Sequence, residues 1–114
     1  MTVRSPRWPA VRAAHLLREP TCAACGESVA LAVHHVRPYH LFSALELDPD
    51  NLLSLCEQPH QRCHFMFGHF ANWSLWNPDV RADAAGFRQG LRLAQKEKAM
   101  LTPLLFAAAL LAPP

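Results

Sequence analysis

Two pairs of cysteines constrain this sequence more than any other feature. Cys22 and Cys25 are separated by two residues, and Cys56 and Cys63 follow about thirty residues later with six residues between them. Paired cysteines of this kind surround one zinc ion tetrahedrally, and a closed thiolate site holds a fold together without catalysing a reaction. The second spacing is longer than the usual two to four residues, so His60 is an alternative to Cys63. The sequence predicts a structural Zn2+.

The alternative is that these cysteines are free and pack as small hydrophobic residues.

The segment Met1–Pro9 is charged and no apolar stretch follows it, so it does not resemble a secretory signal. A cytoplasmic protein is therefore expected, in which reduced thiols favour a metal over disulfides. No uninterrupted apolar run reaches the ~18 residues of a membrane span, so no membrane partner is expected.

Length and composition indicate a single soluble domain over residues 1–114. The chain has 114 residues, of which 51% are hydrophobic and 18% charged. Its net charge is only +2, but four arginines precede the first acidic residue, Glu19; they are Arg4, Arg7, Arg12 and Arg18. A basic segment favours a polyanionic partner, although a solvated helix face explains the charges equally well.

Residue patterns predict a mixture of helices and short strands. A basic N-terminal segment, residues 5–19, contains a predicted helix over 9–18 that ends before Pro20. Strands are expected over 29–36 and 51–56, and a further helix begins at His64. A C-terminal extension, residues 79–112, carries a helix over 79–100 that Gly86 and Gly90 weaken. The apolar face of the first helix is expected to comprise Val11, Ala14, Leu16 and Leu17.

Histidine is unusually frequent, with seven residues in the chain, and two are adjacent at the end of the first predicted strand. His34 and His35 would point to opposite faces of a regular strand, so one site can use both only where the strand ends or bulges. A neutral imidazole binds a metal or accepts a proton near pH 7. His15 is expected to be an ordinary hydrogen-bonded side chain, and His40 is left open between that and a role in a site.

These residues together resemble the HNH endonuclease family in its zinc-stapled form. The resemblance covers residues 20–69, within a predicted core of residues 20–72, and rests on four segments: Cys22-x2-Cys25-Gly, Val33-His34-His35-Val36-x-Pro38, Asp48-Pro-Asp-Asn51-Leu-Leu-x-Leu-Cys56 and Cys63-His64. It implies an α+β fold, the ββα-metal unit, in which two antiparallel strands and a helix clasp one divalent ion.

The resemblance also implies roles for individual residues. His35 corresponds to the general base that deprotonates the attacking water, and His34 to a metal ligand. Asn51 corresponds to the residue that fixes the loop and so aligns the base. His64 corresponds to the final histidine and a second metal ligand. His69 lies five residues further on, ~140° around a regular helix, and reaches the same ion only if the helix breaks there.

The implied activity is hydrolysis of DNA phosphodiester bonds with a divalent cation, which could be Mg2+, Mn2+, Ni2+ or Zn2+. Five arginines are candidates for phosphate contacts, namely Arg4, Arg7, Arg12, Arg37 and Arg62. Trp73 and Trp76 are expected to be packing residues. The alternatives are a non-catalytic zinc-stabilised nucleic-acid-binding domain and a protein-binding zinc domain.

Overall fold

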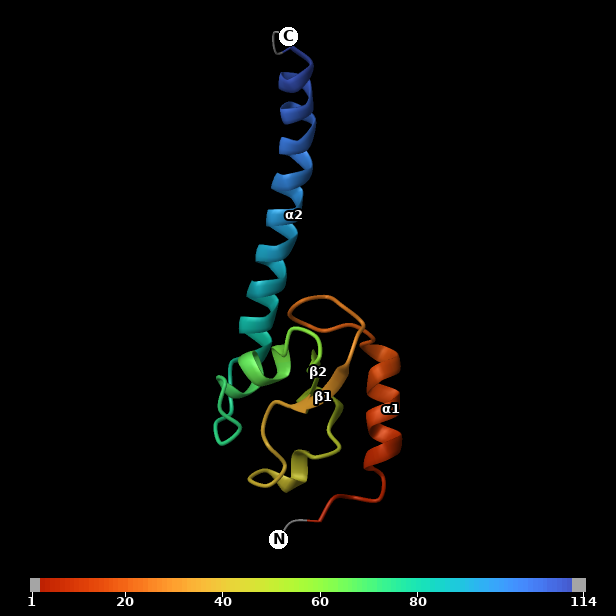
Figure 1. The fold of residues 1–114 in the computed structure, drawn as a ribbon. Helices are drawn as coiled ribbons and strands as arrows, with labels where there is room; N and C mark the ends of the chain where they lie inside the picture. Colours follow the sequence, from red (N-terminus) through yellow and green to blue (C-terminus); the bar gives the residue numbers. More distant parts are fainter. Residues whose placement is uncertain (1–2, 112–114) are drawn as a thin grey trace.

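The chain folds into a small α+β core from which one long helix projects (Figure 1). The structure is a computed structural model that describes residues 3–111, with side chains as far as residue 101. Its elements, in chain order, are helix α1 (Trp8–Arg18), strand β1 (Leu31–His35), 3-10 helices η1 (Ser43–Leu45) and η2 (Pro49–Asn51), strand β2 (Leu52–Cys56), the π-helix η3 (His64–Gly68) and helix α2 (Val80–Leu111). The predicted α+β class is confirmed.

The two strands form an antiparallel pair at the centre of the core. Leu31 of β1 lies opposite Cys56, and His35 lies opposite Leu52. All five residues of β2 are buried, whereas β1 becomes buried only at its last two residues. Helix α1 contacts both strands, η3 contacts β1, and Leu53 and Leu55 of β2 pack in the core with residues of α2. The two buried residues at the end of β1 are the adjacent histidines, His34 and His35.

Helix α1 buries a different face from the one expected. His15 is only 1% exposed, whereas Leu17 is 85% exposed. Trp8, Val11 and His15 share one face because they are spaced by three and then four residues, and Leu17 lies on the opposite side. The prediction that Leu17 belongs to the buried face was therefore wrong, because the helix is rotated about its axis so that His15 faces the core.

Helix α2 is longer than predicted and continues through Gly86 and Gly90. Val80 and Ala84 in its first turns are buried in the core, and Phe87 packs on Phe67 at 5.1 Å between ring centroids. Beyond these turns the helix extends away from the core, as the molecular dimensions of 73 × 26 × 23 Å reflect (Figure 1). Among the residues described, no helix is long and apolar enough to cross a membrane.

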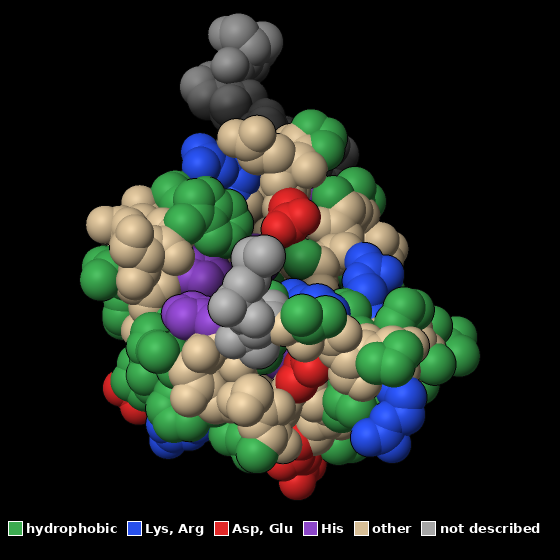
Figure 2. Space-filling model, turned by 90° about the horizontal axis from the view of Figure 1, so that it is seen from below, with side chains coloured by type: hydrophobic (Ala, Val, Ile, Leu, Met, Phe, Trp, Pro, Cys, Tyr) green, Lys and Arg blue, Asp and Glu red, His purple; other side chains and the backbone are tan. Residues whose placement is uncertain are grey.

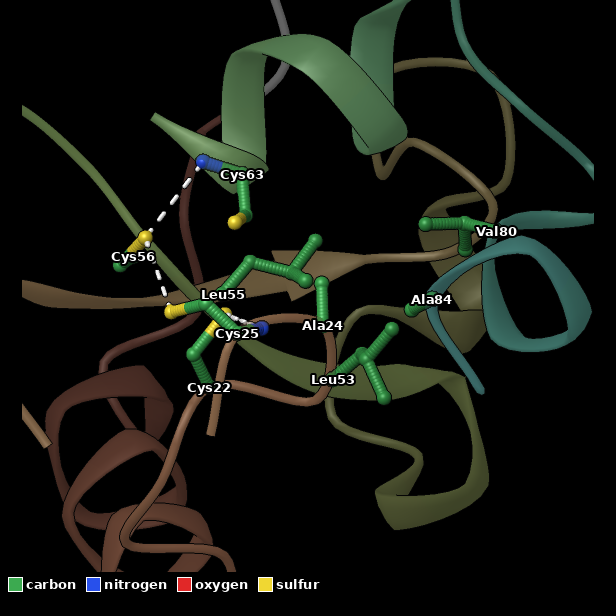
Figure 3. Close-up of a cluster of buried hydrophobic side chains, with 9 residues drawn as sticks. All are labelled: Cys22, Ala24, Cys25, Leu53, Leu55, Cys56, Cys63, Val80 and Ala84. Carbon is green, nitrogen blue, oxygen red and sulfur yellow. Dashed lines mark hydrogen bonds between the residues drawn. The ribbon is translucent and has the colours of Figure 1, made fainter. Parts of the chain in front are cut away.

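The buried core joins the cysteines to aliphatic side chains from three elements. Leu53 and Leu55 come from β2, Ala24 from the first cysteine loop, and Val80 and Ala84 from α2. Figure 3 shows the sulfur atoms gathered on one side of this cluster. A core this small would gain stability from a metal ion bound by these sulfur atoms.

Candidate metal centres and active site

The four cysteines form one buried group, here called the cysteine cluster: Cys22, Cys25, Cys56 and Cys63. Their sulfur atoms all lie within 4.8 Å of one another, and the Sγ atoms of Cys25 and Cys56 are 3.8 Å apart. A tetrahedron with Zn–S bonds of ~2.3 Å has edges of ~3.8 Å, so the cluster can bind a zinc ion. His60, the alternative ligand, is not part of this group.

The long second spacing is accommodated by a turn. His60 donates its backbone N–H to the carbonyl of Glu57, 2.9 Å away, and this turn brings the chain back towards Cys56. The backbone N–H of Cys63 then lies 3.5 Å from the Cys56 sulfur. In the first pair, the N–H of Cys25 lies at the same distance from the Cys22 sulfur. Both pairs therefore present their sulfurs to a common point.

Burial changes the chemistry of these thiols. It raises the pKa of Cys25 to about 11 and also raises the pKa of Cys63. Without a metal both groups are protonated at neutral pH. Because a zinc ligand must be a thiolate, metal binding here releases protons and depends on pH.

A second group, here called the histidine cluster, comprises His34, His64 and His69. One ring nitrogen from each lies within 4.8 Å of the others, and the ring centroids are 4.9, 5.1 and 5.0 Å apart. His34 comes from β1, His64 begins η3, and His69 follows its end. The two ligands implied by the resemblance thus lie together, and a third histidine joins them.

His69 reaches the cluster because η3 is a π-helix rather than an α-helix. A π-turn is closed by a hydrogen bond between residues five apart, so residues 64 and 69 lie one turn apart on nearly the same side of the helix. The helix then ends at Gly68, and His69 has a non-helical backbone with φ −129° and ψ 10°. The sequence left this ligand conditional on such a break.

Gly68 allows β1 and η3 to approach closely. A Cβ atom on Gly68 would lie 2.9 Å from Cε1 of His34 and 3.2 Å from its Nε2. Nothing larger than glycine fits without moving the His34 ring. This close packing holds His34 against the other two histidines.

Hydrogen bonds orient two of the three rings. Nδ1 of His64 lies 2.8 Å from Oε1 of Glu57, and Nδ1 of His69 lies 2.7 Å from the carbonyl oxygen of Leu75. A carbonyl oxygen can only accept a hydrogen bond, so Nδ1 of His69 is protonated and its Nε2 is free to bind a metal. The carboxylate of Glu57 likewise favours a proton on Nδ1 of His64, which leaves Nε2 of His64 free. Sequence reasoning missed Glu57, although a carboxylate directly after Cys56 was a possible signal.

His34 is the most buried member of the cluster. Its Nε2 is buried and has no hydrogen-bond partner among the described residues. Burial, with the neighbouring His64 and His69, lowers the pKa of His34 to about 3. Burial also lowers the pKa of His64, against the opposing effect of Glu57. A divalent cation binds an imidazole only when the ring nitrogen carries no proton, so neutral rings and a buried nitrogen without a partner are suited to bind such a cation.

His35 points to the other face of β1 but borders the same depression. Its Nε2 lies 2.9 Å from the carbonyl oxygen of Glu46, and its ring packs on Trp8 at 4.6 Å between centroids. The carbonyl accepts, so Nε2 carries the proton and Nδ1 keeps its lone pair. Burial lowers the pKa of His35, which is 8% exposed, despite the hydrogen bond to Glu46. The ring is held neutral in one orientation.

A depression of about 320 Å³, here called the main hollow, brings the predicted residues together. Its lining includes Arg4, His34, His35, Tyr39, His40, His64, His69 and Trp73. Histidine side chains reach the surface on the face turned away from α2 (Figure 2). Because β1 ends at His35, residues on its two faces can both border this hollow.

Asn51 fastens the loop between the strands. Its Oδ1 accepts from the backbone N–H of Arg37 at 2.8 Å, and its Nδ2 donates to the carbonyls of Arg37 and Leu45 at 3.0 and 3.1 Å. Its own carbonyl accepts from the N–H of Val36 at 2.8 Å. These bonds fix the chain directly after His35 and directly before Glu46, whose carbonyl holds the His35 ring.

Among the predicted phosphate contacts, the structure brings Arg4 to the main hollow. Its guanidinium lies over the rings of Tyr39 and Trp8, at 4.1 and 4.8 Å from their centroids. The other four do not line this hollow: Arg7 and Arg12 are exposed on or beside α1, Arg37 lies over Phe42 and Trp76, and Arg62 lies over Phe65.

Trp73 contacts other rings, including Phe65, but it is not the core residue that the sequence suggested. It is 58% exposed, and its ring lies 5.3 and 4.8 Å from those of His64 and His69. Trp76 does pack, against Phe42 at 5.7 Å between centroids. The short spacing of the two tryptophans in the sequence did not distinguish their environments.

The comparisons with known proteins agree with this geometry. Residues 22–65 match a protein-family model described as HNH endonuclease. No curated protein and no solved structure matches the chain. The matched segment contains the whole cysteine cluster, both strands, Asn51 and His64. The family that this model describes suggests a nuclease or another function on nucleic acids, and residues 22–65 are the part of this chain that is similar to it.

Proposed function

We propose that this protein is a metal-dependent HNH endonuclease that hydrolyses DNA phosphodiester bonds. One observation carries the proposal: His35, a neutral histidine with a free Nδ1, borders the same hollow as three histidines arranged to bind one cation. A domain that only binds nucleic acid needs neither group, and it does not need them side by side.

The histidine cluster holds the cation in this proposal, and the cysteine cluster holds the structural Zn2+. A divalent ion at an open site supplies positive charge against the negative charge that develops on the phosphate oxygens during hydrolysis. His34, His64 and His69 occupy at most three coordination positions, which leaves room for substrate. Four thiolates, by contrast, fill the tetrahedral site completely.

His35 acts as the general base. Its Nδ1 takes the proton of the attacking water, and the resulting imidazolium is stabilised by donation from Nε2 to the Glu46 carbonyl. The lowered pKa keeps His35 unprotonated, and therefore competent as a base, at neutral pH. Asn51 positions His35 indirectly, because it fixes the loop backbone on both sides of the His35–Glu46 contact.

Arg4 provides a phosphate contact at the edge of the main hollow. The side chain is 43% exposed and forms a long ion pair with Glu46, 3.8 Å between Nη1 and Oε2, so the exposed part of the guanidinium is available to an anion. A contact of this kind orients the DNA backbone without reading its bases.

Plasmid cleavage tests the proposal directly. Wild-type protein and the His35→Ala variant are incubated with supercoiled plasmid and Mg2+, Mn2+, Ni2+ or Zn2+. We expect nicking or linearisation by the wild type and a loss of roughly 10²- to 10⁴-fold in the variant, as is usual when a general base is removed. Unchanged circular dichroism would show that the variant is folded.

His40→Ala is the matched control, because His40 lines the main hollow but belongs to no cluster. We expect it to cleave within a few-fold of the wild type. A wild-type protein that retards plasmid on a gel but cleaves it with none of the four ions would replace this proposal with the non-catalytic binding domain.

A further inference from the structure

A smaller depression, here called the side hollow, lies next to the histidine cluster. Its volume is about 260 Å³, and it is lined by Glu57, Gln58, Arg62, Phe65 and Trp73. It adjoins the main hollow through Trp73, which lines both, and through Glu57, which holds the His64 ring. A group bound there would lie next to whatever occupies the metal site.

We propose that the side hollow binds one unpaired nucleobase of the strand whose phosphate lies at the histidine cluster. The inference rests on the proposed function and adds a substrate preference to it: the protein favours nucleic acid with an unpaired nucleotide beside the cleavage site. No residue of this hollow except Glu57 takes part in holding the histidines through a hydrogen bond.

The walls of the side hollow suit a flat aromatic ring. The rings of Phe65 and Trp73 lie 4.9 Å apart between centroids at an angle of 47°, and Trp73 is 58% exposed. The guanidinium of Arg62 lies 4.5 Å from the Phe65 centroid and adds a third planar group. Aromatic side chains and arginine planes are the surfaces on which unpaired bases stack.

The charges favour a base over a phosphate in this position. The carboxylate of Glu57 forms part of the wall and would repel a phosphate, while Arg62 offsets its charge. Gln58 is exposed and offers both a donor and an acceptor to the edge of a base. The phosphate is therefore expected at the histidine cluster and the base in the side hollow.

Size and access limit what can enter. The volume is slightly below the roughly 300–1,000 Å³ of ordinary small-molecule sites, which suits one base better than two. In a duplex, both faces of a base are covered by its neighbours, so a base enters such a site only from a single strand, a bulge or a flipped position.

Arg62 also has an uncommon backbone conformation. Its φ is +61°, in the left-handed region that non-glycine residues rarely adopt. This conformation accompanies the placement of its guanidinium over Phe65 at the wall of the side hollow. Backbone conformations of this type are enriched at ligand sites.

Fluorescence of 2-aminopurine tests the proposal separately from cleavage. The His35→Ala protein with Mg2+ is titrated with a short oligonucleotide that carries 2-aminopurine unpaired in a single strand, unpaired in a bulge, or paired in a duplex. We expect quenching with the single strand and the bulge, and little with the duplex. Trp73→Leu should weaken the quenching interaction roughly 5- to 100-fold, and Trp73→Phe should retain most of it.

Phe70→Leu is the matched control, because Phe70 is 53% exposed and does not line the side hollow. Calorimetric titration of Trp73→Leu with Ni2+ checks that the histidine cluster still binds metal, since Trp73 touches two of its rings. If the histidine cluster is lost in Trp73→Leu, the comparison is made with Gln58→Ala, which we expect to weaken binding of the unpaired base.

Equal quenching in all variants, or equal quenching with paired and unpaired 2-aminopurine, would overturn the base-binding proposal. The two proposals fail separately. Quenching without plasmid cleavage by the wild type would support the base subsite and contradict the nuclease proposal. Cleavage without selective quenching would support the nuclease proposal and contradict the base subsite.

Discussion

Substitution of Gly68 by alanine tests whether close packing of η3 on β1 creates the metal site. The added methyl group would meet Cε1, Nδ1 and Nε2 of His34 at 2.9, 3.1 and 3.2 Å. His34 is 2% exposed and is enclosed by the rings of His64 and His69, so it cannot swing aside freely. The substitution therefore moves a metal ligand without removing any ligand atom.

The size of the effect follows from the geometry. The His34 ring must move by about 0.5 Å to restore an ordinary contact, more than the ~0.2 Å within which metal–ligand distances are normally held. We expect a loss of roughly 10- to 100-fold in metal affinity, or about 1.4–2.7 kcal/mol. Overpacking also costs about 1–3 kcal/mol of folding stability, partly offset by about 1 kcal/mol because alanine favours helices over glycine.

Gly86→Ala is the matched control. A Cβ atom on Gly86 meets nothing within 4 Å, so this variant should be stabilised by about 0.4–1 kcal/mol and bind metal normally. Titration calorimetry with Ni2+ measures the histidine cluster, and thermal unfolding measures stability. If Gly68→Ala binds Ni2+ as tightly as Gly86→Ala, the reasoning about the His34 contact is refuted.

Four further predictions follow from other contacts. Glu57→Gln should weaken Ni2+ binding roughly 10- to 100-fold, because the carboxylate no longer polarises His64; unchanged affinity by calorimetry would contradict this. Asn51→Ala loses three side-chain hydrogen bonds to the loop between the strands, so its free energy of unfolding in urea should be about 2–4 kcal/mol lower. A decrease below about 1 kcal/mol would contradict the role of Asn51 in holding this loop. Cys63→Ser should lower the zinc content measured by atomic absorption, whereas His60→Ala should retain one zinc per chain. Finally, the pKa of His34 is lowered to about 3 from 6.5, so on acidification the unfolded chain binds this proton before the folded chain does. The free energy of unfolding should therefore fall from pH 6.5 towards pH 3. Urea unfolding should show a smaller fall for His34→Gln.

The strands and the cysteine cluster could be predicted closely from the sequence. β1 and β2 occupy residues 31–35 and 52–56, inside the predicted ranges 29–36 and 51–56. Strand limits are set locally, by the turn-forming residues that flank each apolar run, such as Pro38 after β1 and Pro49 before β2. The cysteines were identifiable for a related reason, since a close pair of thiols followed by another is rarely explained by packing alone.

The helices were predicted less well than the strands. α1 buries His15 instead of Leu17, since its rotation is set by packing of Trp8 on His35. α2 continues through Gly86 and Gly90, although glycine weakens helices locally. For α1, tertiary contacts selected one of the faces that the local sequence allowed, whereas in α2 the helix-favouring residues around the two glycines outweigh their local cost.

The sequence by itself determined which groups are available: thiols that could bind a structural metal, imidazoles that could bind a second metal, and a histidine next to them in the chain that could accept a proton. Only the tertiary structure decided that His69 joins the histidine cluster, that Glu57 holds His64, and that both faces of the end of β1 border one hollow. The physical reason is that these features depend on a π-turn and on hydrogen bonds between separate segments. Residue types and spacing specify which groups are available, whereas the packing of η3 and the interstrand loop against the sheet specifies where they meet.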